Sequence, residues 1–233
     1  MRLIVDTSIF IHANYFIHGR SDSMFLADKS WDQIIGIGIR NFPGSEITLS
    51  LDSDNIFRRT IDPNYKSSRD KHPFDRNEIN EILSRRSRAL VQDHLESDDI
   101  IYLFTRKYPD AVIVSNDNDF RLMLDNGRTF FKYREKNSIT LTDEEVLIER
   151  VKKVCEGCTS DDIPNIKLKR FGVAKIKKYL AEDHIHKSLP YILENFQQSG
   201  HIGPWADNYE LANYDVDTYK KYLNGIDKFI DSL

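Results

Sequence analysis

The sequence predicts an α/β fold with a mainly parallel central sheet and a helical C-terminal part. Three short apolar runs, at residues 2–5, 47–51 and 111–114, are rich in β-branched or aliphatic side chains. Because they lack the polar–apolar alternation of half-exposed strands, they resemble parallel strands buried on both faces. Helical patterns lie between these runs, and this alternation of strands with helices favours an α/β fold.

Two helices are predicted between the second and third strands. The first begins near Asp75, where Glu78 completes a capping box, and continues to Leu90. The second begins at residues 97–99 and ends before Pro109. Each pattern therefore has a start signal and a defined length.

The second half of the chain is predicted to be helical. Thr142 caps a helix, a loop follows at 157–166, and a lysine-rich helix covers 173–181. We expect an α/β core at 1–150 and a helical part at 151–233, packed together as one body.

Composition indicates a soluble globular protein. The chain has 233 residues, of which 40% are hydrophobic, so it can bury a sizeable core. No apolar run is long enough to span a membrane, and Asp6 interrupts the apolar start, which we interpret as a strand and not a signal peptide. With only two cysteines, no disulfide framework is expected and a cytoplasmic location is the default.

The net charge of −4 hides two basic segments. A protein that holds cations next to phosphate needs carboxylates in one place and basic side chains in another. The basic side chains of segments 57–71 and 163–178 are Arg58, Arg59, Lys66, Arg69, Lys71, Lys167, Lys169, Arg170, Lys175, Lys177 and Lys178.

All three predicted strands are followed by aspartates, at Asp6, Asp52 and Asp117. Ligands of open parallel sheets bind outside the carboxyl ends of the strands, so these side chains are expected to converge on one cleft. Other nearby carboxylates are Glu96, Asp98, Asp99 and Asp119. Clustered carboxylates need a compensating cation, and hard oxygen ligands favour Mg²⁺ or Mn²⁺. Two such ions, roughly 4 Å apart, can drive hydrolysis of a phosphodiester.

The segment Tyr65-Lys-Ser-Ser-Arg69 supplies groups that suit a phosphate substrate. Lys66 offers a point charge, Arg69 a bidentate fork, and Tyr65 a face on which a base can stack. Arg58 and Arg59, just upstream, are expected to guide the phosphate backbone.

Several motifs in this order resemble the 5′ nucleases, which include flap endonucleases and phage 5′-to-3′ exonucleases. The matching segments are Asp6, LDSDNIFRR with Asp52, DPNYKSSR at 62–69, HLESDD at 94–99, SNDNDF at 115–120 and GCTSDDIPNI at 157–166. Segment 62–69 looks especially like that of short phage exonucleases, and if the chain is phage-encoded, its expected location is the cytoplasm of a bacterial host.

The resemblance implies a PIN-like fold with helices on both faces of the sheet and a cleft that holds two metal ions. Asp6, Asp52, Glu96 and Asp98 would form the first metal site, and Asp99, Asp117, Asp119 and Asp161 would serve the second metal or bridge both. Lys66 and Arg69 would be electrophilic groups, and Tyr65 would stack on the terminal nucleotide. The substrate would be DNA with a 5′ end, with an RNA–DNA duplex as an alternative, and the products would carry 5′-phosphates.

The resemblance also implies a helix-hairpin-helix that binds duplex DNA, with a monovalent cation. Here the element is degenerate, but Gly172 and Lys175 remain, together with Lys167, Lys169 and Arg170. A short segment at about 70–95 would form a reduced arch, which favours exonuclease action over capture of long flaps.

The late motif departs from the family pattern, because Cys158 replaces its first aspartate and Asp162 replaces its asparagine. A neutral thiol is a poor Mg²⁺ ligand, so a weaker second site is expected. The spacing of Cys155 and Cys158 also fits half a zinc site, but there is no second such pair. Two further interpretations are a PIN-type endoribonuclease and a DNA-binding relative with weakened catalysis.

Overall fold

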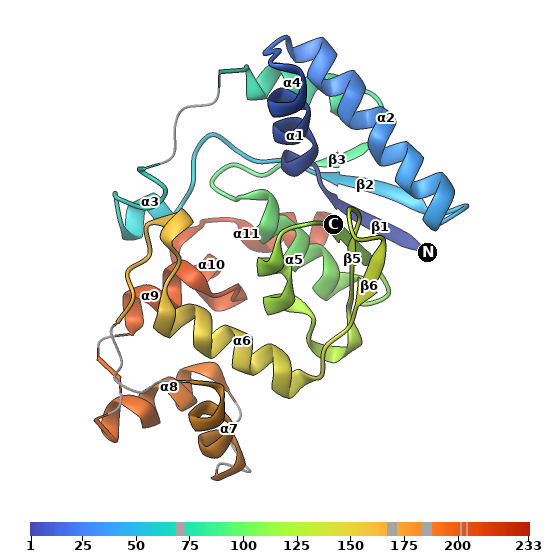
Figure 1. The fold of residues 1–233 in the computed structure, drawn as a ribbon. Helices are drawn as coiled ribbons and strands as arrows, with labels where there is room; N and C mark the ends of the chain where they lie inside the picture. Colours follow the sequence, from blue (N-terminus) through green and yellow to red (C-terminus); the bar gives the residue numbers. More distant parts are fainter. Residues whose placement is uncertain (69–72, 167–171, 183–187, 201, 204) are drawn as a thin grey trace.

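A six-stranded sheet organises the chain (Figure 1). Its strand order is β3-β2-β1-β4-β5-β6, and all neighbours are parallel except β5 and β6. The strands are β1 Arg2–Asp6, β2 Glu46–Ser50, β3 Arg88–Leu90, β4 Val112–Ser115, β5 Thr129–Lys132 and β6 Asn137–Ile139. The computed structural model describes residues 1–68, 73–166, 172–182, 188–200, 202–203 and 205–233.

The helices lie before, between and after the strands, and the C-terminal third is helical (Figure 1). They are α1 Ser8–His18, α2 Ser23–Asn41, α3 Arg58–Ile61, α4 Arg76–Ser84, α5 Ser97–Lys107, α6 Asp143–Glu156, α7 Val173–Glu182, α8 Leu189–Gln198, α9 Ala206–Ala212, α10 Val216–Tyr222 and α11 Ile226–Ser232. Among the residues described, none of these helices is both long and apolar enough to cross a bilayer.

Helices cover both faces of the sheet. In β1, Leu3 and Val5 belong to a core cluster that includes residues of α1, α2 and α4, whereas Ile4 belongs to a cluster that includes residues of α5 and α10. Successive strand side chains point to opposite faces, so a strand buried on both sides must be apolar throughout. The predicted mainly parallel α/β fold with a helical C-terminal part is confirmed.

A third core cluster forms around α6. Val151 and Val154 of this helix pack with Ile176 of α7, Phe196 of α8 and Leu211 of α9. The expected division between 1–150 and 151–233 therefore falls inside a helix that also contacts the 3₁₀ helix after β4.

The helix predicted from Asp75 to Leu90 is too long. Helix α4 ends at Ser84, and the chain then turns into the edge strand β3, where Leu90 is the register partner of Ser50. A three-residue strand has no detectable period, and its pairing with β2 outweighs the local helical pattern.

The predicted caps at Asp75 and Thr142 are confirmed, but among the described contacts only Thr142 has the return hydrogen bond that completes a capping box. Asp75 accepts a hydrogen bond from the Glu78 amide (3.0 Å), and Thr142 forms a full capping box with Glu145 at the start of α6. These caps satisfy backbone amides that have no partner within the helix.

Candidate metal centre

A cavity of about 1000 Å³ lies beside the carboxyl ends of β1, β2 and β4. The predicted carboxylates line it, with the exception of Asp99: they are Asp6, Asp52, Glu96, Asp98, Asp117, Asp119 and Asp161. These residues come from separate parts of the sequence, and the topology of a parallel sheet brings them to one edge.

Asp6, the last residue of β1, is 2% exposed. The hydroxyl of Ser8 donates to its Oδ1 (2.7 Å), and that of Ser115 donates to its Oδ2 (2.8 Å). Burial is the main cause that raises the pKa of Asp6 to about 7, and repulsion from Asp52 and Asp117 adds to it, while the two serine hydrogen bonds oppose the shift. The side chain is therefore fixed in position, but its charge is only partly compensated.

Asp98 and Asp117 share this electrostatic problem. Burial, followed by repulsion from Asp6 and Asp117, raises the pKa of Asp98 well above its ordinary value. Burial, followed by repulsion from Asp119, raises the pKa of Asp117. Asp52 lies beside these three carboxylates. It accepts a hydrogen bond from the Ser97 amide (2.8 Å), which holds it against the start of α5.

A divalent cation fits this first group, defined as Asp6, Asp52, Asp98 and Asp117. Of these four side chains only Asp6 is buried, but carboxylates that repel one another are stabilised when a cation sits between them. All donors of the group are carboxylate oxygens, and this donor set suits Mg²⁺ or Mn²⁺.

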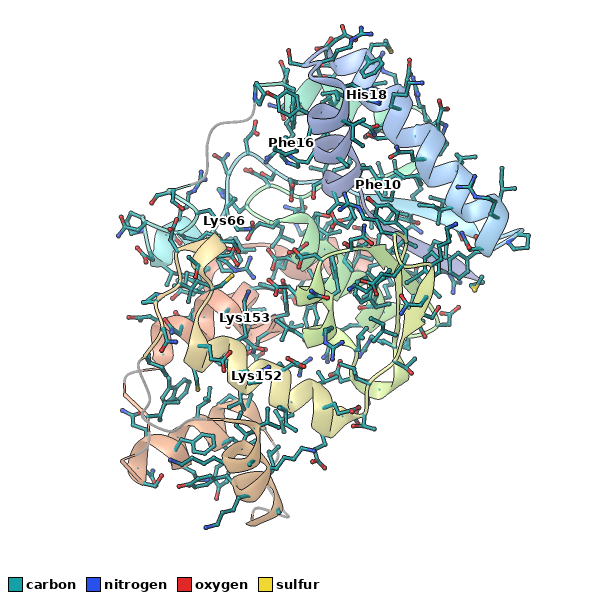
Figure 2. The ribbon with its side chains drawn as sticks, in the orientation of Figure 1. Phe10, Phe16, His18, Lys66, Lys152 and Lys153 are labelled. Carbon is teal, nitrogen blue, oxygen red and sulfur yellow. The ribbon has the colours of Figure 1, made fainter. Side chains whose placement is uncertain are left out.

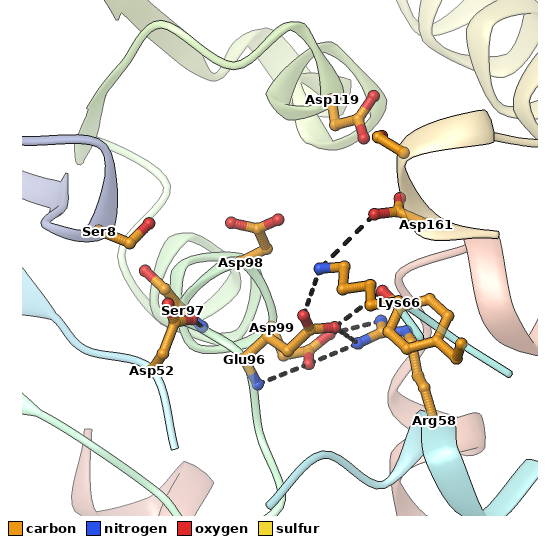
Figure 3. Close-up of polar contacts among 12 residues, drawn as sticks. Ser8, Asp52, Arg58, Lys66, Glu96, Ser97, Asp98, Asp99, Asp119 and Asp161 are labelled. Carbon is orange, nitrogen blue, oxygen red and sulfur yellow. Dashed lines mark hydrogen bonds and ion pairs between the residues drawn. The ribbon is translucent and has the colours of Figure 1, made fainter. Parts of the chain in front are cut away.

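A second group consists of Asp119, Cys158 and Asp161. One ligand atom from each residue lies within 4.8 Å of the others, so these three side chains could hold a second ion. In Figure 3, Asp119 and Asp161 lie near each other, on the opposite side of the view from Asp52.

The loop that carries Cys158 and Asp161 is held by its backbone. The Cys158 amide donates to the Ile163 carbonyl (2.9 Å), and the Ile163 amide donates back to the Cys158 carbonyl (3.0 Å). Gly157 precedes this pair at φ +70°, and a Cβ there would lie 2.4 Å from the Ile163 oxygen. Only glycine fits this position, so the sequence of the turn determines where the two ligands point.

Lys66, labelled in Figure 2, extends between Glu96 and Asp161 in the close-up of Figure 3. Its ammonium forms an ion pair with Glu96 Oε1 and lies 3.7 Å from Asp161 Oδ1. Burial alone would raise the pKa of Glu96, but the pairs with Lys66 and Arg58 outweigh it and lower this pKa to about 2. Glu96 is therefore an ion-pair partner of Lys66 in the lining of the cavity, and its charge also adds to the repulsion that raises the pKa of Asp98.

Tyr65 does not offer the open face expected for base stacking. It is 4% exposed, and its hydroxyl donates to Glu96 Oε2 (2.9 Å). The ring packs in the core cluster around α6, so burial of this aromatic side chain leaves little of it for a nucleotide.

Arg58 and Asp99 form a buried ion pair with each other, and not the DNA contact and the metal ligand that were expected. Arg58, expected to contact DNA, is 3% exposed, and its Nη1 and Nη2 donate to both oxygens of Asp99 (2.7 and 2.6 Å). Asp99, expected to bind metal, is 0% exposed and also accepts from the Tyr219 hydroxyl (2.8 Å) and the Glu96 amide (3.0 Å). Each is satisfied internally, so their geometry indicates a structural pair.

The remaining predicted DNA contacts are only partly described. Arg59 is exposed and lines the cavity. Gly172 and Lys175 lie at the start of α7, where the Lys175 amide donates to the Gly172 carbonyl (2.9 Å). Four further predicted residues lie outside the described part of the chain: Arg69, Lys167, Lys169 and Arg170.

Sequence reasoning missed Lys153. Its ammonium lies 2.7 Å from Asp119 Oδ2 and 3.6 Å from Asp161 Oδ2, and the side chain is 13% exposed. Burial would lower the pKa of Lys153, but the ion pair with Asp119 outweighs it and raises this pKa. The sequence did hold a signal for this residue. Lys153 lies in the last turn of α6, and the loop with Cys158 follows that helix directly, so a side chain there can reach the loop.

The fold of this chain is similar to that of the bacteriophage T5 5′-exonuclease. Two similar solved structures are the bacteriophage T5 5′-exonuclease with divalent metal ions (zinc) bound and the T5 D15 protein co-crystallised with metal ions. The TM-scores are 0.68 and 0.69, at 16% sequence identity in both cases. The alignments cover 100% and 99% of this chain, and 98% and 97% of the T5 chains.

A third similar structure is a T5 flap endonuclease variant in a complex with DNA and metal ions. It has a TM-score of 0.64 and 15% identity, and it covers 99% of this chain and 97% of that chain. No protein-family model matches the sequence, and no curated protein matches it either. The likeness therefore lies in the fold, and the chemistry must be argued from the side chains of this chain.

Proposed function

We propose that this chain is a metal-dependent nuclease that hydrolyses phosphodiester bonds in DNA from 5′ ends. The observation that carries the proposal is the convergence of carboxylates from β1, β2, α5 and the segment after β4 on one cavity, with Lys66 beside them. Clustered carboxylates that repel one another are typical of a site built for divalent cations. The fold is shared with nucleases whose structures contain metal ions and DNA.

The first ion, Mg²⁺ or Mn²⁺, would be held by Asp6, Asp52, Asp98 and Asp117. The second would be held by Asp119 and Asp161, with Cys158 as the third side chain of that group. When bound, the two ions would supply Lewis acidity and a hydrolytic nucleophile for the phosphodiester. This division moves Asp117 to the first ion and leaves Asp99, which does not line the cavity, out of the ligand set, whereas Glu96 stays a proposed ligand of the first ion beside Asp98.

Lys66 would provide the positive charge closest to the scissile phosphate. Glu96 holds its ammonium next to Asp161, at the boundary between the two carboxylate groups. The low pKa of Glu96 keeps this ion pair charged across the neutral range. Arg69 is proposed to act beside Lys66, and Tyr65 to act indirectly, by holding Glu96 in place.

Contact with the DNA backbone is proposed for two surfaces. Arg59 lies at the cavity and can bind phosphate near the cleaved bond. The start of α7, with Gly172 and Lys175, together with Lys167, Lys169 and Arg170, would bind the duplex further away, with a monovalent cation at that element. Such contacts carry most of the affinity and make it dependent on salt.

The substrate is proposed to be a nicked or blunt duplex end, with RNA–DNA duplex as an alternative to DNA. Much of the segment expected to form an arch belongs to the α/β body, because α4 packs on α2 and β3 pairs with β2. This leaves a short span for capture of a long single strand. We therefore expect exonuclease action to exceed cleavage of long 5′ flaps, and the products to carry 5′-phosphates.

The test uses matched nicked, blunt and flapped duplexes carrying a 5′ label, with Mg²⁺ or Mn²⁺. The Asp117→Asn variant should abolish cleavage and leave DNA binding intact or tighter. Asp32→Asn, an exposed aspartate on α2, is the matched control and should retain full activity. Cleavage that persists in Asp117→Asn would contradict the site, whereas cleavage of single-stranded RNA alone would favour a PIN-type endoribonuclease.

A further inference from the structure

We infer that Tyr214 is a positioning residue of the proposed nuclease, because its hydroxyl orients the carboxylate of Asp98 in the cavity. The inference rests on the proposed function, since Asp98 is one of the ligands assigned there to the first ion. It goes further because it gives a residue of the C-terminal helical part, in the short segment between α9 and α10, a role in the reaction.

The carboxylates of the first group differ in what holds them. Serine hydroxyls or backbone amides donate hydrogen bonds to Asp6, Asp52 and Asp117. Among the described residues, the hydrogen bond that reaches the Asp98 side chain comes from the Tyr214 hydroxyl, which lies 3.4 Å from Oδ2. Tyr214 therefore supplies to Asp98 what serines and the backbone supply to the other three carboxylates.

Asp98 needs such a donor because its neighbours repel it. Repulsion from Asp6 and Asp117 favours rotation of the Asp98 carboxylate away from the other ligands of the first ion. A neutral hydroxyl opposes this rotation without adding a positive charge that would compete with a cation. A hydrogen bond to one carboxylate oxygen also leaves the second oxygen for the ion.

The packing of the Tyr214 ring fixes the position of its hydroxyl. A distance of 3.4 Å is long for a hydrogen bond between two oxygens, so the placement of the donor matters. Tyr214 is 9% exposed, and its ring centroid lies 6.0 Å from that of Tyr102 and 5.8 Å from the guanidinium carbon of Arg58. These contacts keep the residue in the lining of the cavity, beside Asp98.

Tyr209 offers a matched control in the same part of the chain. Its hydroxyl donates to Asp215 Oδ2 (2.6 Å), and Tyr209 is not among the described residues that line the cavity. Asp215 is the N-cap residue of α10 and is not a proposed ligand. Replacement of either tyrosine by phenylalanine keeps the ring and removes one hydrogen bond to an aspartate.

The experiment is a calorimetric titration of the full chain with Mn²⁺ in the absence of DNA. Tyr214→Phe should weaken the binding of Mn²⁺ about tenfold or more, whereas Tyr209→Phe should bind Mn²⁺ as tightly as the wild-type chain. Urea unfolding followed by circular dichroism establishes that both variants are folded.

Cleavage of a nicked duplex is then measured over a range of Mn²⁺ concentrations. Tyr214→Phe should need about tenfold more Mn²⁺ for its half-maximal rate. Saturating Mn²⁺ should restore most of the rate, and the KM for DNA should stay unchanged, because the substitution acts through the ion and not through substrate binding.

The outcomes separate this inference from the proposed function. Wild-type affinity for Mn²⁺ in Tyr214→Phe overturns the positioning role and leaves the nuclease proposal standing. An equal loss of affinity in Tyr209→Phe also overturns it, because the effect would then come from a general loosening of the C-terminal part. A wild-type chain that binds no Mn²⁺ by calorimetry and cleaves no DNA overturns the proposed function, and this inference with it.

Discussion

Replacement of Arg58 by methionine separates a structural role from the DNA contact expected from the sequence. The guanidinium is 3% exposed and makes contacts of 2.6–3.0 Å with Asp99, Glu96 and the Leu211 carbonyl. Methionine fills a similar volume but leaves the Asp99 charge buried without its main partner. Loss of one member of a buried ion pair costs about 3–5 kcal/mol, because the remaining charge is uncompensated.

The assay is urea unfolding followed by circular dichroism, supported by thermal unfolding. The free energy of unfolding should fall by about 4 kcal/mol, and Tm should fall by roughly 10 °C for a chain of this size. The control is Arg59→Met, whose exposed side chain should change stability by less than about 0.5 kcal/mol and should instead weaken DNA binding.

Two results would refute this reasoning. One is a stability change of less than about 1 kcal/mol in Arg58→Met, which would mean that Asp99 finds another partner or reaches water. The other is a selective loss of DNA affinity with stability unchanged, which would restore Arg58 to the phosphate-binding role.

Three further predictions concern the cavity. Because the folded-state pKa of Asp6 is raised to about 7 from 3.8, the folded protein binds the extra proton between these values. The metal-free chain should therefore lose stability as pH rises from about 4 to about 7, and Asp6→Asn should make this slope shallower in thermal unfolding, the remainder coming from Asp98 and Asp117; an unchanged slope would contradict the raised pKa of Asp6. Gly157→Ala should cost about 1–3 kcal/mol in urea unfolding, because its Cβ would meet the Ile163 carbonyl at positive φ; full stability would show that the loop relaxes freely. Lys153→Met should reduce the rate of cleavage by about 10- to 100-fold, because it removes a positive charge beside Asp119. The control is Lys152→Met, which removes the adjacent lysine of α6 and its contact with Glu149 and should leave the rate nearly unchanged. Equal effects of the two substitutions would contradict this assignment.

Residues at strand ends could be predicted from the sequence. Asp6, Asp52 and Asp117 follow apolar runs that predict parallel strands, because they lack polar–apolar alternation. A parallel sheet then brings these three aspartates to a common edge. The Thr142 cap was equally readable, because a capping box is a local pattern of four residues.

Other features depend on partners far away in the sequence. The burial of Arg58 depends on Asp99 and Tyr219, which only the tertiary structure brings to it. Strand β3 is too short to show a period, and it exists because β2 offers an edge for it. Lys153 was missed because the face that a helical lysine presents depends on how α6 packs.

The C-terminal helices reach the carboxylates directly. The Tyr214 hydroxyl donates to Asp98 (3.4 Å), the Tyr219 hydroxyl to Asp99, and the carbonyl of Leu211, at the end of α9, accepts from Arg58. A fragment that keeps the whole sheet but stops before α9 would therefore expose acidic side chains that now have partners. Removal of the segment that carries Leu211, Tyr214 and Tyr219 is therefore expected to destabilise the sheet edge where the acidic side chains gather.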